Sequence, residues 1–378
     1  MNAHTLIHCK ATDTLEMLPL DPIAIGSSPG QPDAGRQALI WVLGGSKLGD
    51  NSQLLRAVEA MNLPFQYKDI VLRPNALSLH LPVRATLSHI DLELSSALVA
   101  PWPDLVVTIG RHLSCVALWL KKQSGGRTKI ALFNAPRARK GDFDLVLVPA
   151  HYVMSEDSRV LRYRFPLTAL NHKAVVQAPP RPSPHEPIHV LLIGGPTKEL
   201  ILDTAVATDI LKTMRTTHAK TGHIAIVTSR RTPADLIEEL QAQLLPGETL
   251  YRWKANDAKN PYRPLLAVGQ TFTVTGDSPS MLTDIASLGK RLVIAPLPAS
   301  RSIALRMEQR LEEISRKLST KIPNWSLPAP AKRNYNILHQ LLIEQGYAVM
   351  LGDEPKAPTL PFPDESQLVA EGLKSLLR

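Results

Sequence analysis

Two apolar segments that each end in a pair of glycines constrain the fold of this chain most strongly. Ala38 to Leu43 (ALIWVL) runs into GGSK, and Ile188 to Ile193 (IHVLLI) runs into GGPTK. A short apolar run that ends at glycine is typical of a buried strand in a parallel sheet, because helices cover both faces of such a sheet. Its recurrence in the second half of the chain predicts two Rossmann-like units in tandem.

Further strands and helices alternate after each of these segments. This alternation predicts an α/β fold with two Rossmann-like domains that face each other across a cleft. The expected strands lie near residues 65–71, 104–109, 129–133, 145–148, 224–228, 249–253, 271–275 and 292–295, and the expected helices near 52–61, 111–122, 198–216, 301–318, 334–345 and 364–377.

The domain boundaries follow from composition. The stretch 176–187 holds five prolines in twelve residues and few large apolar groups, which is typical of an extended linker. We therefore expect five parts, which are a flexible lead-in at 1–36, a first Rossmann-like domain at 37–175, the linker at 176–187, a second Rossmann-like domain at 188–330, and C-terminal helices at 331–378 that pack back on the first domain.

Charge and cysteine content narrow the functional class. The net charge of +9 favours acidic partners, of which we expect nucleotides and anionic membrane headgroups rather than nucleic acid, although general basicity without a dedicated patch is the alternative. Cys9 and Cys115 are the only cysteines, which excludes a disulfide framework and fits a reducing compartment. Since neither a targeting signal nor a membrane-spanning run is found, we expect a cytoplasmic protein with peripheral contact at the inner membrane.

The stretch from Thr271 to Pro298 contains the clearest candidate binding site. A β-branched strand is followed by a loop rich in hydroxyl groups, a helix that begins at Pro279, and a second strand. Ser278, Ser280 and the free amides of the helix start could hold a phosphate. Asp284 follows one turn later and could bind the hydroxyls of a ribose. The structural alternative is a capping serine with a solvated aspartate.

Two arginines and the absence of common nucleotide motifs refine this interpretation. Arg230 and Arg231 follow a predicted strand, where they could neutralise a diphosphate, or they form a solvated pair beside a helix cap. Neither a P-loop nor a complete G-x-G-x-x-G motif is present, so ATP hydrolysis and dinucleotide redox chemistry lose support. Because no metal-binding pattern is found either, we expect no metal and no cofactor.

Asp50 is the candidate general base. It ends the first glycine-rich loop, where a carboxylate could remove a proton from an acceptor hydroxyl. An N-cap role for the following helix is the alternative. His112 and His151 are alternative bases, although a lone histidine in a loop is more often structural.

Several of these segments together resemble one family. The segments are WVLGGSKLGDNSQ, PWPDLVVTIGRH, SGGRTK, FDLVLVPAHY, LLIGGPTK, VTSRRTP, NPY and VTGDSPSMLTDIASLGK, and they cover roughly residues 40 to 300. They are similar to the bacterial relatives of the plant elongated-mitochondria fission factor, a group treated as glycosyltransferases of the glycosyltransferase-B fold. The resemblance implies that a sugar nucleotide binds mainly to the second domain and an acceptor mainly to the first.

The resemblance also implies roles for individual residues. Asp284 departs from the usual glutamate of the family, which weakens the ribose contact or draws the nucleotide closer. The Gly49-Asp50 pair is similar to the Gly-Asp turn of heptosyltransferases, in which the aspartate is the base. The implied nucleotide-sugar residues are Gly194, Gly195, Ser229, Arg230, Arg231, Ser278, Ser280, Met281 and Asp284, and the implied acceptor-side residues are Gly45, Ser46, Lys47, Gly49, Gln53 and Arg111.

The resulting hypothesis is a metal-independent glycosyltransferase that acts on a glycan or lipid-linked acceptor of the cell envelope. In its inverting form, Asp50 takes the acceptor proton, while retaining chemistry stays open. Basic segments such as Arg137 to Lys140 could hold the enzyme at anionic headgroups. The alternative from another class is a non-catalytic adaptor on the same fold.

Overall fold

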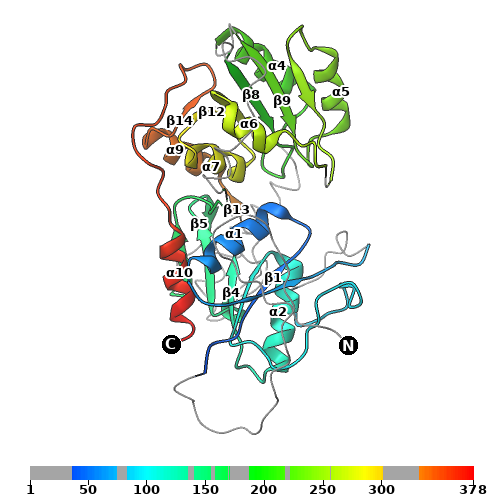
Figure 1. Cartoon of the computed structure of the whole chain (residues 1–378), viewed down its shortest axis with the longest axis vertical. Coiled ribbons are helices and arrows are strands. Elements are labelled where there is room, and N and C mark those ends of the chain that lie inside the picture. Colours follow the sequence, from blue (N-terminus) through cyan, green and yellow to red (C-terminus); the bar gives the residue numbers. More distant parts are fainter. Residues whose placement is uncertain are drawn as a thin grey trace, which may run out of the picture.

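The structure, a computed structural model, contains two α/β domains stacked end to end (Figure 1). This arrangement confirms the predicted fold class. The residues that the structure describes are 36–74, 83–134, 140–154, 158–168, 170, 187–217, 222–255, 257–300 and 332–378. The predicted lead-in up to residue 35, most of the proline-rich linker, the predicted helix at 301–318 and residues 135–139 of the basic segment lie outside them.

The first domain is built on a parallel six-stranded sheet of order β2-β1-β3-β4-β5-β7. β1, β3 and β5 are buried along their whole length, which explains why they are continuous apolar runs in the sequence. The strands are β1 (Ile40–Gly44), β2 (Gln66–Asp69), β3 (Leu105–Ile109), β4 (Lys129–Phe133), β5 (Leu145–Pro149) and β7 (Val160–Tyr163), and the helices are α1 (Leu48–Glu59) and α2 (Arg111–Gln123).

The second domain repeats this plan with the strand order β10-β9-β8-β11-β12-β14, again parallel throughout. The sheet continues beyond residue 330, the end that the sequence predicts for this domain, because β14 pairs with β12. Its strands are β8 (Ile188–Ile193), β9 (His223–Thr228), β10 (Thr249–Tyr251), β11 (Thr271–Thr275), β12 (Arg291–Ala295) and β14 (Ala348–Met350), and its helices are α4 (Thr204–Thr217), α5 (Ala234–Ala242), α6 (Tyr262–Val268), α7 (Pro279–Ser287) and α9 (Tyr335–Glu344).

Two elements link the domains. The chain leaves β14 and returns to the first domain, where α10 (Ser366–Ser375) packs against α1 (Figure 1). An ion pair between Arg56 and Asp364 adds to this contact. In addition, β6 (Tyr152–Val153) pairs in antiparallel fashion with β13 (Lys332–Arg333), so a short ribbon joins the two halves beside the gap between them.

In each domain the chain reverses its direction of winding at the middle of the sheet. The reversal falls between β1 and β3 in the first domain and between β8 and β11 in the second. Open parallel sheets bind ligands at such points, outside the carboxyl ends of the strands. The fold therefore offers two ligand edges.

Candidate active site

A cleft of about 1240 Å³ lies between the two domains. It is larger than the 300–1,000 Å³ or so of a typical small-molecule site, so it has room for two substrates. Both ligand edges contribute to it. The predicted site residues among its lining are Gly45, Ser46, Lys47, Gly49, Asp50 and Gln53 from the first domain and Arg230, Arg231, Ser278 and Ser280 from the second.

Asp50 lies where the domains approach each other. α1 begins at Leu48, so Asp50 belongs to the first turn of the helix and is not its N-cap. A Cβ on the neighbouring Gly49 would lie 3.8 Å from Oγ of Ser280 in the other domain. Burial raises the pKa of Asp50, whereas the positive charges of Lys47 and Arg230 lower it. Its carboxylate therefore belongs to the first domain but is influenced by a cation of the second.

The start of α7 faces the same cleft. The helix begins at Pro279, as the sequence predicts, and Gly289 follows its end with a φ of 65°. No acidic residue lies in the first turn of α7, and the Ser278 side chain makes no capping hydrogen bond. The positive end of the helix dipole therefore faces the cleft, which is lined by the exposed Ser280 and by Ser278, a residue that is 7% exposed, and this arrangement is suited to a phosphate.

The double glycine of the second domain has a different role from the one predicted. The amide of Gly195 donates to Oδ2 of Asp277 at 2.9 Å, and the amide of Gly194 donates to Thr275. A Cβ on Gly194 would lie only 2.1 Å from Oδ2 of Asp277. These amides cannot hold a phosphate while they are used in this way. In this structure Gly194 and Gly195 make room for a buried carboxylate, and their contact with a nucleotide stays a prediction.

Asp277 in turn holds Arg231. Nη2 of Arg231 lies 2.6 Å from Oδ2 of Asp277, and its Nη1 donates to the carbonyl of Gly195 at 3.0 Å. The Asp277 side chain is fully buried, whereas 39% of the Arg231 side chain is exposed. Arg231 is thus a clamped residue whose charge is already balanced. Arg230 differs, because it forms no ion pair within the described part of the chain.

Like Gly194 and Gly195, three further predicted nucleotide residues do not line the cleft. The hydroxyl of Ser229 donates to the carbonyl of Gly194, and Met281 packs against the core of the second domain. Asp284 accepts hydrogen bonds from Thr168 at 2.6 Å and from Tyr262 at 2.9 Å, one on each carboxylate oxygen. Burial raises the pKa of Asp284 to about 6, although both hydrogen bonds lower it. Asp284 is therefore a structural residue here, and the predicted ribose contact finds no support in its position.

The histidines compare unfavourably with Asp50 as bases. His151 lines the cleft, but burial, together with the charges of Arg333 and His339, lowers its pKa to about 3. An imidazole with so low a pKa is a weak proton acceptor. His112 and Arg111 lie outside the large cleft, in a smaller pocket that adjoins Asp50.

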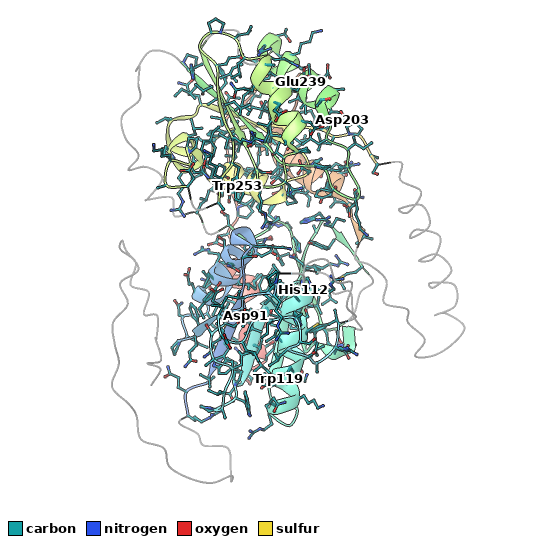
Figure 2. All side chains as sticks on the ribbon, turned by 90° about the vertical axis from the view of Figure 1, so that its right-hand side faces the viewer. Asp91, His112, Trp119, Asp203, Glu239 and Trp253 are labelled. Carbon is teal, nitrogen blue, oxygen red and sulfur yellow. The ribbon has the colours of Figure 1, made fainter. Side chains whose placement is uncertain are left out.

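Sequence reasoning missed several cleft residues. Trp253 follows β10 and lies on the side of the second domain nearer the first (Figure 2). The sequence could have predicted Trp253 as a cleft residue, because it follows a strand and therefore lies at the same edge of the sheet as Arg230. Asp277 appears in the sequence only as part of a turn. Arg333, which pairs with Glu199 at 3.1 Å, had no local signal because β13 brings it to the cleft from far along the chain.

Comparison with known proteins identifies the family. The model of the family described as Mitochondrial fission ELM1 matches residues 49–357. The chain belongs to this family. One family relative, an uncharacterized protein of Rickettsia prowazekii, is 24% identical over 345 residues, which cover 80% of this chain and 95% of the relative. The mitochondrial fission protein ELM1 of Arabidopsis thaliana is 22% identical over 219 residues, about half (51%) of each chain.

This family member also has distant matches among solved structures. A UDP-GlcNAc 2-epimerase of Methanocaldococcus jannaschii, solved with UDP-GlcNAc and UDP, aligns with 89% of this chain and 99% of its own, at a TM-score of 0.45 and 10% identity. Within the described residues, no cluster of three or more His, Cys, Asp or Glu side chains could hold a metal ion. None of the helices described there has the length and apolar character needed to cross a bilayer.

Proposed function

We propose that this protein is a metal-independent glycosyltransferase that transfers a sugar from a nucleotide donor to a hydroxyl of a cell-envelope glycan or lipid. One observation carries the proposal. In a single cleft, the Asp50 carboxylate of the first domain lies close enough to Arg230 of the second for their charges to interact, beside the uncapped start of α7. A proton acceptor and a diphosphate-binding end are thus held on opposite walls.

The donor fits the second-domain wall. Its diphosphate would lie against the start of α7 and the hydroxyls of Ser278 and Ser280, with Arg230 as a cation for which no ion pair is found in the described part of the chain. Trp253 offers a flat ring for a nucleobase beside the same edge. Arg231 supports this wall indirectly, because Asp277 and the carbonyl of Gly195 fix its guanidinium.

The reaction would proceed by direct displacement. The Asp50 carboxylate accepts the proton of the acceptor hydroxyl while that oxygen forms a bond to the anomeric carbon. The bond from that carbon to the diphosphate breaks, and its electron pair leaves with the diphosphate, which Arg230 and the helix dipole stabilise. The raised pKa of Asp50 suits this role, since a stronger base accepts the proton more readily near neutral pH.

Calorimetric titration with nucleoside diphosphates and cytidine monophosphate tests the proposal. Wild type should bind one of them, and Arg230→Gln should weaken binding roughly tenfold or more, because a charge-assisted hydrogen bond contributes about 1.5–3 kcal/mol. Arg291→Gln is the matched control, because Arg291 is an exposed arginine at the first residue of β12 and does not line the cleft. If no nucleotide binds to wild type, the proposal fails.

A second candidate is a non-catalytic adaptor on the same fold. It is favoured by the family description and by the name of the Arabidopsis relative, both of which refer to mitochondrial fission. An adaptor needs no proton acceptor in the cleft. It therefore predicts no release of nucleoside diphosphate from any sugar nucleotide and no effect of Asp50→Asn on partner binding.

A further inference from the structure

Two buried polar atoms on the first-domain wall of the cleft have no hydrogen-bond partner in the described part of the chain. They are Oε1 of Gln53 and Nδ1 of His151. Both residues line the cleft, although only 7% of Gln53 and 3% of His151 are exposed. A buried polar atom without a partner destabilises a fold, so nearly all such atoms in proteins are paired. Two of them on one wall of a cleft are explained if a bound molecule supplies the missing partners.

Both residues lie near Asp50. Gln53 follows Asp50 by three positions in α1, so the two side chains share one face of the helix. His151 directly precedes Tyr152, the first residue of β6. Burial raises the pKa of Tyr152, Arg333 opposes this rise, and the nearby charge of Asp50 adds to it. Gln53 and His151 are therefore placed around the candidate base, where a molecule held at Asp50 could reach them.

The ring of His151 is held between two tyrosines. Its centroid lies 4.7 Å from that of Tyr152 and 6.2 Å from that of Tyr335, and the rings of the second pair are nearly parallel, at 17°. The backbone of His151 is held as well, because its carbonyl accepts a hydrogen bond from the amide of Asn334 at 2.8 Å. A side chain that is already fixed loses little conformational freedom when it binds a ligand.

The missing partner is a neutral group that can donate a hydrogen bond. Oε1 of Gln53 only accepts, so an ionised phosphate or carboxylate, which also only accepts, cannot pair with it. His151 is uncharged near neutral pH, since burial and the charges of Arg333 and His339 lower its pKa to about 3. A neutral imidazole offers one donor and one acceptor. A hydroxyl, which both donates and accepts, matches the two residues.

We propose that Gln53 and His151 bind a second hydroxyl of the acceptor, and that the acceptor is therefore a sugar rather than a lipid alcohol with a single hydroxyl. A sugar ring carries hydroxyls on successive carbons, so one can meet Asp50 while its neighbour meets Gln53 or His151. A site with buried polar groups discriminates strongly against a molecule without the matching hydroxyl, because those groups then stay unpaired. Whether the bound sugar is the acceptor depends on the function proposed above, whereas sugar binding follows from the two unpartnered atoms.

Saturation-transfer NMR of the full chain with the methyl glycosides of glucose, galactose, mannose and N-acetylglucosamine tests this site, alone and with each nucleoside diphosphate. Its comparison molecule is 1-hexanol, which has one hydroxyl. Wild type should bind at least one glycoside. Gln53→Leu and His151→Phe should each weaken that binding about fivefold, the loss expected for one neutral hydrogen bond, and should not alter the binding of 1-hexanol. His151→Phe keeps an aromatic ring between the two tyrosines.

Thr108→Val is the matched control. Oγ1 of Thr108 is also buried without a partner in the described part of the chain, but Thr108 belongs to β3 and does not line the cleft. Gln53→Leu and Thr108→Val should both keep or raise the melting temperature, because each removes an unpaired polar atom. Only Gln53→Leu should weaken glycoside binding. A glutamine with a purely structural role would instead lower the melting temperature when it is replaced.

Four outcomes separate the possibilities. Failure of every methyl glycoside to bind wild type, or binding that neither variant weakens, overturns the proposal. Equal weakening of 1-hexanol binding also overturns it, since the two residues would then hold a lone hydroxyl. If glycosides bind as expected but no nucleoside diphosphate does, the transferase function fails and the sugar site stands. If a nucleoside diphosphate binds through Arg230 but no glycoside binds, the sugar site fails and the transferase function stands.

Discussion

Removing Arg231 should destabilise the protein more than neutralising Asp277, because only Asp277 is completely buried. Arg231→Ala leaves a buried carboxylate whose remaining hydrogen bond comes from the amide of Gly195. Breaking a buried pair costs about 3–5 kcal/mol, and since 39% of the Arg231 side chain is exposed we expect about 2–3 kcal/mol.

Asp277→Asn should cost only about 1 kcal/mol. Both hydrogen bonds that Asp277 receives end on the same oxygen, so the amide oxygen of asparagine can accept both. The double variant should be less destabilised than the sum of the two single ones, because the buried charge that Arg231→Ala leaves behind is absent from it.

Urea unfolding at pH 7 measures these differences through the shift of the transition midpoint. Lys374→Ala is a suitable control, since its pair with Glu371 is at the surface and should contribute less than about 1 kcal/mol. Equal costs for the two single variants, or additivity within about 0.3 kcal/mol, would refute the idea that Asp277 is a buried anion held by Arg231.

Three further predictions concern other residues. Asp284→Asn should stabilise the protein at pH 8 but not at pH 3. The pKa of Asp284 is about 6 in the folded state and near 3.8 in the unfolded state, so the folded state keeps its proton to a higher pH. The free energy of unfolding of the wild type therefore falls by up to about 3 kcal/mol as the pH rises through this range. Gly194→Ala should lower the urea midpoint, because its Cβ meets Asp277, whereas Gly49→Ala, with 3.8 Å to its nearest neighbour, should not. Trp253→Ala should weaken nucleotide binding by about 1–3 kcal/mol if a base stacks on it, as titration calorimetry would show.

Each of these has a contrary result. A pH-independent difference between Asp284→Asn and wild type would mean that Asp284 is not held partly protonated. Equal midpoints for the two glycine variants would contradict the close approach of Asp277 to Gly194. Unchanged nucleotide affinity in Trp253→Ala would place the base elsewhere in the cleft.

The sequence was most informative where one local property determines structure. Strands such as β8 and β11 are buried from end to end, so continuous apolar runs revealed them. The start of α7 was predicted because Pro279 has a fixed preference for the first helical turn. Asp50 and Arg230 could be predicted to lie at the cleft, which both of them line, because ligand sites of parallel sheets follow the strands directly.

The sequence was least informative where a side chain meets a distant partner. Gly195 bonds to Asp277, 82 positions later, so a glycine pair that resembled a phosphate loop proved to accommodate a carboxylate. Asp284 has the helical spacing expected for the cleft, but Thr168, 116 positions earlier, occupies one of its oxygens. The pocket at Arg111 likewise needs three strands to bring its walls together.

A crystal structure with the most tightly binding nucleoside diphosphate would test the central claim most directly. The account predicts that the diphosphate lies at residues 278–280, with a guanidinium nitrogen of Arg230 within hydrogen-bond distance of it. It also predicts that the part of the cleft next to Asp50 is left unoccupied by the nucleotide. A nucleotide bound wholly within the first domain, or one whose phosphates contact neither Arg230 nor the start of α7, would contradict it.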